Sequence, residues 1–280
     1  MSRNRTRLEH AKTWSKRLLV LIAGGTAVGG LLWVGQVARD WVCRTPYFQL
    51  KSIEYRGAQY FDVEAFNVVL LRTFEKNLLR LDLERIRSVL ESEAWIKRAV
   101  VRRRFPDRLV IYLTERRPAA VAAVDGQLYV VASDGVLLDV FHSGYGDIQG
   151  PIVRGLRNPA RDRAGTENAV RMETYLRLVE EFRASDPSLL QRISEVDVTE
   201  PERVGILLVD DPTPIYLGDR DFLARYRRFE ANRTVYLELR ERYGQVEYVD
   251  AGYRDRIVFH TPQTLAEQKN SPRPGPELTN

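Results

Sequence analysis

The sequence predicts an α+β protein with one N-terminal membrane-spanning helix, then a small mixed domain, then a β-rich domain. Three observations predict this class. One long segment near the N-terminus carries no charge. The elements that follow it have the order β-α-α-β-β, and the rest of the chain holds more short strand-like runs than helical ones.

The uncharged segment runs from Leu18 to Ala38. As a helix its 21 residues measure about 31 Å, close to the ~30 Å hydrocarbon core of a bilayer. Six of the first 17 residues are basic and one is acidic, so the positive-inside rule places the N-terminus in the cytoplasm. The alternative is a cleaved signal peptide, which has a shorter apolar run and a small-x-small cleavage site. The chain instead leaves the segment through Gln36–Asp40, and a retained anchor fits better.

The charge balance argues against a nucleic-acid ligand. The chain has 43 basic and 38 acidic residues, and the excess of five lies in the first 17 residues. The part expected outside the membrane is therefore neutral, whereas nucleic-acid-binding domains carry basic patches. Cys43 is the single cysteine, so no internal disulfide can form.

The first domain is expected between Tyr47 and about residue 117. Alternating residues predict a strand that ends at Gly57. Two short helices follow, Val63–Phe74 with an apolar face of Phe66, Val69, Leu70 and Phe74, and then 83–93, capped by Asp82. Two strands, 96–105 and 109–115, complete the domain.

The second domain is expected to place two helices on a mainly antiparallel sheet. The helices are predicted over 166–183 and 219–243, and a hairpin over 127–141 turns at Asp134-Gly135. Further strands are predicted over 193–198, 204–209, 214–217, 246–250 and 256–260.

No residue pattern indicates catalysis, a metal or a cofactor. The three histidines lie far apart in the sequence, and no zinc-protease motif, nucleophile elbow or phosphate-binding loop is present. A pair of carboxylates that cleaves a glycan would leave no mark in the sequence, so a membrane-tethered wall hydrolase stays as a rival. The sequence predicts a protein that is not an enzyme and binds no cofactor.

Two segments are candidate binding sites. Arg102, Arg103 and Arg104 form the most basic cluster beyond the membrane segment, with Arg103 pointing opposite to its neighbours. The cluster is either a docking face or a solvated strand on which Arg103 pairs with an acid such as Glu115.

The other segment is the last predicted strand. Arg256, Ile257, Val258 and Phe259 would lie at a sheet edge whose free N–H and C=O groups can accept a partner strand, with Tyr253 as an aromatic anchor. The alternative is that the tail or a loop covers this edge.

These residues resemble the FtsQ/DivIB family of bitopic cell-division proteins. The resemblance is most specific in the first domain, in the first strand from Phe48 to Gly57, in the linking segment Asn77–Asp82, and from Ala94-Trp95-Ile96 through Phe105-Pro106 to Ala120. It is looser in the segments 214–218 and 248–250. Ala94 and Lys76 depart from the family pattern, in which proline and glycine are usual at those turns.

The resemblance implies a POTRA domain followed by an FtsQ-type β domain. It also implies a non-enzymatic scaffold of the divisome that binds FtsB and FtsL and helps recruit and regulate the septal synthases FtsW and FtsI. The POTRA domain is implicated in recruitment, and FtsB adds a strand at the C-terminal edge. Carried over to this sequence, the FtsB site is Tyr253 with Arg256–Phe259, and the protein sits in the inner membrane at the septum.

The expected organisation has six parts: a cytoplasmic tail (1–17), a membrane helix (18–38), a linker (39–46), a POTRA domain (47–117), a β domain (118–260) and a disordered tail (261–280). A POTRA component of another envelope assembly or secretion complex is the alternative function. That alternative calls for several POTRA units or a strand-rich barrel without a cytoplasmic anchor, and the sequence has neither feature.

Overall fold

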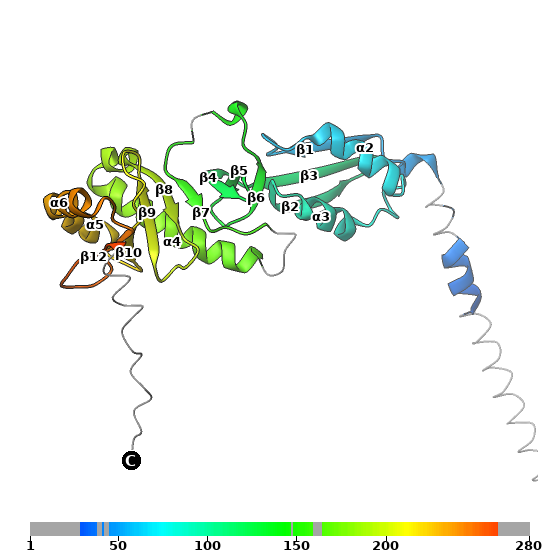
Figure 1. Ribbon diagram of the computed structural model, residues 1–280. Coiled ribbons are helices and arrows are strands. Elements are labelled where there is room, and N and C mark those ends of the chain that lie inside the picture. Colours follow the sequence, from blue (N-terminus) through cyan, green and yellow to red (C-terminus); the bar gives the residue numbers. More distant parts are fainter. Residues whose placement is uncertain (1–28, 38–40, 42–44, 147, 159–163, 263–280) are drawn as a thin grey trace, which may run out of the picture. The chain divides into compact units, whose positions relative to one another are not determined.

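The computed structural model describes residues 29–37, 41, 45–146, 148–158 and 164–262. Its contacts divide the chain into two compact units, with the division between Glu115 and Arg116 (Figure 1). Each unit has its own sheet and its own hydrophobic core.

The predicted membrane helix lies largely outside the described residues. Within the segment Leu18–Ala38, residues 29–37 are helical and exposed, and the others are not described. No helix in the described part of the chain has both the length and the apolar character needed to cross a bilayer. Most of the predicted disordered tail, residues 263–280, is likewise outside the described residues.

Unit 1 has the predicted β-α-α-β-β order after a short 3-10 helix, η1 (Pro46–Phe48). Its elements are β1 (Ser52–Arg56), α2 (Val63–Thr73), α3 (Leu83–Ser92), β2 (Ile96–Arg104) and β3 (Arg108–Glu115). The strand order is β1-β3-β2, with β1 parallel and β2 antiparallel to the central β3.

Local side chains explain where these elements begin and end. Asp62 and Asp82 accept backbone N–H bonds at the starts of α2 and α3, which satisfies donors that a helix N-terminus leaves free. Gly57 ends β1 at a φ of +86°, and a Cβ there would collide with the Leu113 carbonyl. The Glu115 carboxylate accepts the next three turn N–H groups, those of residues 59–61.

The prediction is wrong for one residue of the apolar face of α2. Phe66 and Leu70 of α2 are buried and Phe74 packs against them, but Val69 is 47% exposed. The strongest apolar stripe of α2 follows the spacing of Phe66, Leu70 and Phe74, and Val69 lies beside it on the solvent-facing side.

Unit 2 is built on a nine-stranded sheet with the order β12-β11-β10-β9-β8-β7-β4-β5-β6. Five of its eight pairings are antiparallel, so the predicted mainly antiparallel sheet is confirmed. The strands are β4 (Pro118–Val124), β5 (Gln127–Ala132), β6 (Leu137–Val140), β7 (Ile152–Arg154), β8 (Ile193–Asp197), β9 (Val204–Leu208), β10 (Ile215–Gly218), β11 (Tyr248–Asp250) and β12 (Val258–His260). The predictions did not include β4 and β7, which lie in the middle of the sheet.

Three α-helices, rather than the predicted two, contribute to the unit 2 core: α4 (Ala164–Ser185), α5 (Phe222–Ala231) and α6 (Arg233–Tyr243). The unit also has the 3-10 helices η2 (Ser143–Tyr145) and η3 (Pro187–Arg192). The single helix expected over 219–243 is interrupted at Asn232, which adopts φ −107° and ψ 14°. The Asn232 amide donates to the Arg228 carbonyl, because asparagine readily bonds its own backbone and so competes with the helix.

Candidate functional site

The predicted edge strand lies at one end of the nine-stranded sheet. β12 covers Val258–His260, which is shorter than the segment expected to begin at Arg256. Among the described residues, β11 is the strand that pairs with β12, in antiparallel register with Val249 opposite Phe259. The other side of β12 is an edge of the described sheet.

The hydrogen bonds of β11 show which β12 groups face this edge. The N–H groups of Val249 and Ala251 donate to the carbonyls of Pro214, just before β10, and Tyr216 of β10. By alternation, the N–H groups of Tyr248 and Asp250 point toward β12. Their partners across the ladder, His260 and Val258, therefore direct their own polar groups toward β11. The Glu247 N–H bond to the His260 carbonyl agrees with this. Phe259 lies between them, and its N–H and C=O point away from the sheet.

The side chains of this segment alternate between the core and the opposite face. Ile257 and Phe259 pack against the unit 2 core, and the Phe259 ring lies 6.3 Å from that of Tyr236 on α6. Val258 is half-buried. The core thus holds the strand by its side chains while the backbone of Phe259 faces outward.

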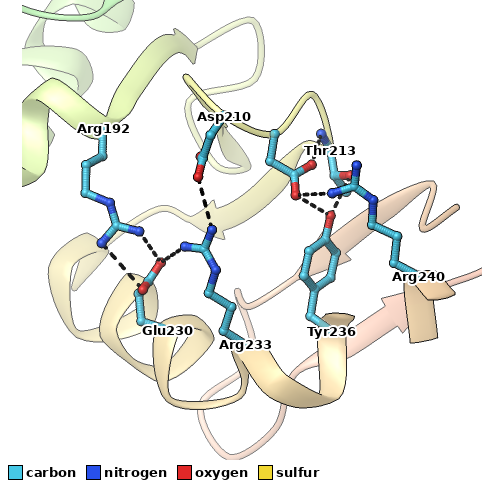
Figure 2. A network of polar contacts seen from close by, with 8 residues as sticks. Arg192, Asp210, Thr213, Glu230, Arg233, Tyr236 and Arg240 are labelled. Carbon is cyan, nitrogen blue, oxygen red and sulfur yellow. Dashed lines mark hydrogen bonds and ion pairs between the residues drawn. The ribbon is translucent and has the colours of Figure 1, made fainter. Parts of the chain in front are cut away.

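A polar network holds the hydroxyl end of Tyr236 (Figure 2), the residue whose ring contacts Phe259. The Tyr236 hydroxyl donates to the buried Asp211 carboxylate at 2.7 Å and lies 2.9 Å from the Thr213 hydroxyl. The Thr213 N–H and Arg240 also bond this carboxylate. Burial alone would raise the pKa of Asp211, but these hydrogen bonds outweigh it, so its pKa is lowered and the group is ionised.

A second cluster ties the junction of α5 and α6 to the sheet, also shown in Figure 2. Glu230 forms ion pairs with Arg192 and Arg233, each at 3.2 Å. Arg233 also pairs with Asp210 at 3.2 Å. Asp210 and Asp211 lie just after β9, and their bonds to Arg233, Tyr236 and Arg240 anchor α6 to the sheet.

On the opposite face of the sheet, aromatic side chains form a ladder that ends on β12. His260 stacks on Tyr248 at 4.0 Å, and Tyr248 meets Tyr216 edge to face at 5.5 Å. The Arg203 guanidinium lies 3.7 Å from the centre of the Tyr216 ring. Sequence reasoning assigned none of this ladder to a site, because its members are scattered between residues 203 and 260 and meet only through the strand order.

His260 is only 8% exposed, and its Nδ1 atom has no hydrogen-bond partner among the described residues. Burial lowers the pKa of His260, Asp250 opposes this shift and Arg203 adds to it. The imidazole is therefore neutral at pH 7.

The structure brings Tyr253 and Arg256 together beside the edge strand. The Arg256 guanidinium lies 4.9 Å from the centre of the Tyr253 ring, and Tyr253 is 45% exposed. Arg228 of α5 donates to the Tyr253 carbonyl at 2.7 Å, which ties the loop before β12 to a helix. All five predicted edge residues thus lie in one segment, with Tyr253 and Arg256 toward solvent and Ile257 and Phe259 toward the core.

The structure does not bring Arg102, Arg103 and Arg104 into one surface. Arg103 donates to the carbonyls of Leu78 and Leu81, each at 2.6 Å, so the predicted pairing with Glu115 is wrong. The reason is register, since Arg103 lies opposite Leu109 while Glu115 lies opposite Ile96, at the other end of the hairpin. Arg102 and Arg104 share the other face, where Arg102 lies over Tyr112 and Arg104 approaches Glu54.

The described residues contain no group of three His, Cys, Asp or Glu side chains that could hold a metal ion. The geometry at the C-terminal edge is suited to binding a strand. It offers outward backbone groups and an exposed tyrosine and arginine. Its apolar side chains, Ile257 and Phe259, are held by packing on the unit 2 core.

Two family models match the two units. A POTRA domain of the FtsQ type matches residues 48–116, and the C-terminal domain of the cell division protein FtsQ/DivIB matches residues 119–251. β12 follows the second match. The chain is thus of the class in which a POTRA domain precedes an α+β, β-rich domain.

Several proteins named cell division protein FtsQ are similar to the chain. The protein of Koribacter versatilis (strain Ellin345) is 26% identical over 87% of this chain and 70% of its own length. That of Syntrophotalea carbinolica is 24% identical over 87% and 86%. That of Neisseria gonorrhoeae (strain ATCC 700825 / FA 1090) is 26% identical over 95% and 98%. The chain belongs to the FtsQ/DivIB family of cell-division proteins.

Proposed function

We propose that this chain is a membrane-anchored, non-catalytic scaffold of the divisome that binds FtsB, alone or in complex with FtsL, at the open edge of β12. Through this complex it helps recruit FtsW and FtsI and regulates septal peptidoglycan synthesis. The observation that carries the proposal is the outward-facing Phe259 backbone, flanked by the exposed Tyr253 and Arg256.

Strand addition suits such an edge because main-chain hydrogen bonds supply affinity and alternate side chains supply specificity. Tyr253 and Arg256 offer an aromatic and a cationic contact beside the incoming strand. The basic tail and the uncharged segment support an inner-membrane location with the N-terminus in the cytoplasm. Anchoring would confine both partners to one surface and so raise their effective concentration.

Arg102 and Arg104 are proposed as a separate docking point for divisome proteins on the POTRA domain. Arg103 lies on the same strand, but its guanidinium already donates to two backbone carbonyls. It therefore contributes to this docking point by its position in the strand and not by its side chain.

The test removes one outward hydrogen-bond donor from the edge. Phe259 is replaced by its α-hydroxy acid, which turns the amide into an ester, deletes the N–H and keeps the aromatic ring. The full chain in nanodiscs is titrated with the extracytoplasmic part of FtsB from the same organism, with and without FtsL. Loss of one net hydrogen bond of about 1 kcal/mol predicts roughly fivefold weaker binding.

The control is the stability of the chain itself. The Phe259 N–H faces away from β11, so the ester removes no donor of the β11–β12 ladder. It only weakens the Val258 carbonyl as an acceptor, so the melting temperature should fall slightly at most. Equal affinity of the ester and the wild type would place the partner elsewhere. No saturable binding by the folded wild type, with or without FtsL, would contradict the scaffold proposal, and wall-degrading activity of the purified chain would favour the hydrolase rival.

A further inference from the structure

An exposed aromatic cluster lies at one end of the unit 1 sheet. The rings of Tyr47 and Phe48 meet edge to face at 5.2 Å, and those of Phe48 and Phe105 at 6.1 Å. Tyr47 is 62% exposed and Phe105 is 58% exposed. We call these three residues the aromatic tip.

Backbone hydrogen bonds from three chain segments fix the position of the tip. The N–H groups of Lys51 and Ser52 approach the Asp107 carbonyl, which joins the start of β1 to the turn between β2 and β3. The Leu78 N–H donates to the Phe48 carbonyl at 2.8 Å. The exposed rings are thus held on a rigid part of the fold, and their exposure is not the result of a loose terminus.

Basic side chains surround the tip. The side chains of Lys51, Arg104 and Arg108 are 68%, 61% and 58% exposed. Asp107, the acid between them, is 20% exposed and pairs with Lys51 at 3.3 Å. Glu54, which lies 3.7 Å from Arg104, has a side chain that is 40% exposed, so each of these cations is more exposed than its acidic partner.

The tip also lies close along the chain to the predicted membrane segment. Eight residues, 39–46, separate Ala38 from Tyr47, and a fully extended chain of that length reaches at most about 29 Å. The described part of this segment is not fully extended, because the Thr45 hydroxyl donates to the Trp41 carbonyl at 2.9 Å and residues 46–48 form η1. Trp41 is itself 73% exposed.

We propose that the aromatic tip docks on the outer surface of the membrane in which the chain is anchored, with its rings at the level of the lipid headgroups. The inference rests on the proposed anchor, because it is the anchor that brings a bilayer within reach. Tyrosine and tryptophan favour the membrane interface, where an apolar ring body and a polar end are both satisfied. Lysine and arginine beside them favour anionic phospholipid.

A lipid surface fits the tip better than a protein partner does. The tip combines exposed aromatic rings with exposed basic side chains at neighbouring positions of the chain, a combination that interfacial anchors share. Docking would restrict the tilt of unit 1 about the linker, so the POTRA domain would meet its partners from a defined height above the bilayer.

The test measures the depth of the tip in liposomes that contain the full chain and anionic phospholipid. In a Cys43→Ser background, an NBD fluorophore is placed at Glu75→Cys, on an exposed loop beside the tip, or at Gln59→Cys, beyond the other end of β1. Lipids that carry a nitroxide at the headgroup quench the fluorophore only at close range. The expected result is strong quenching at position 75, weak quenching at position 59, and loss of the difference in the Tyr47→Ser/Phe105→Ser variant.

A single Tyr47→Ser variant guards against misfolding, because Tyr47 lies on the surface and its loss alone should still reduce quenching at position 75. Equal quenching at the two positions, or quenching that survives the double substitution, would overturn the proposal. Concentration-dependent energy transfer between labelled chains in lipid-free detergent would identify a second copy as the occupant and would also overturn it. Resistance of the chain to carbonate extraction reports the anchor separately, so a failed anchor and a failed tip give different results.

Discussion

The nine-stranded sheet of unit 2 has two edges in the described chain, and they are finished differently. At the β6 edge, the Phe141 N–H donates to the Leu128 carbonyl, so by alternation the Val140 backbone points outward. The Asp139 carboxylate accepts that outward Val140 N–H at 2.7 Å. The Tyr145 hydroxyl in turn donates to Asp139, also at 2.7 Å.

At the β12 edge, by contrast, the side chains pack against one face of the sheet or the other. Ile257 and Phe259 pack on the core and His260 stacks on Tyr248. A charge beside an edge discourages pairing with another strand, and β6 has this protection. Among the described residues, the β6 edge has a carboxylate bonded to its outward N–H group and the β12 edge has none, which agrees with the binding role proposed for β12.

The largest expected effect comes from proline at the two edges. In Val258→Pro the lost N–H is one that points toward β11, and the ring interrupts a three-residue strand. We expect FtsB binding to weaken at least tenfold, about 1.4 kcal/mol or more. In Val140→Pro the lost N–H points outward from β6, so binding should not change. Titration of both full-length variants in nanodiscs tests this, and equal affinities would remove the distinction between the edges.

A smaller effect is expected from the tyrosines that support each edge. Tyr236→Phe removes a buried hydrogen bond to Asp211 and should destabilise the α6–β12 region by about 1–2 kcal/mol. Tyr145→Phe removes an exposed bond to Asp139 and should cost about 0.5 kcal/mol. Hydrogen exchange of the amides in β11 and β12 for Tyr236→Phe, and in β5 and β6 for Tyr145→Phe, gives the local free energy of opening at each edge. A larger loss in Tyr145→Phe than in Tyr236→Phe would contradict this assignment.

The smallest effect is a pH dependence at the β12 edge. Burial lowers the pKa of His260 below the ordinary value of 6.5, so the unfolded chain takes up this proton first as the pH falls. The stability of the β12 region is therefore highest above pH 6.5, and it falls as the pH drops from 6.5 toward the folded pKa. His260→Phe keeps a ring against Tyr248 and should flatten this dependence in urea unfolding at pH 7.5 and 5.5.

The matched control for the pH prediction is His142→Phe, which removes an exposed imidazole beside Tyr145 at the β6 end of the sheet. It should leave the pH dependence as in the wild type. A wild-type slope that persists in His260→Phe would assign the effect to another group.

Local patterns predicted the elements whose shape depends on neighbouring residues. The hairpin of β5 and β6 was predicted from Asp134-Gly135, and Gly135 adopts a φ of +81° in it. The apolar stripe of α4 predicted 166–183, and the helix covers Ala164–Ser185. β4 was missed because five of its seven residues are proline or alanine, which have little strand propensity, and its burial between β5 and β7 decides its conformation.

The sequence by itself determined the β-α-α-β-β order of unit 1, the residue types of the last strand and the absence of a familiar catalytic motif, because spacing and residue type act within a few residues of the chain. Only the tertiary structure decided that the backbone N–H and C=O of Phe259 point outward at the edge, and that the Tyr236–Asp211 hydrogen bond lies next to this strand. It alone also brought together the aromatic ladder of Arg203, Tyr216, Tyr248 and His260. These relations depend on strand order and register between segments that are up to 57 residues apart in the chain. Register is set by the burial of the whole sheet, which no single stretch of sequence contains.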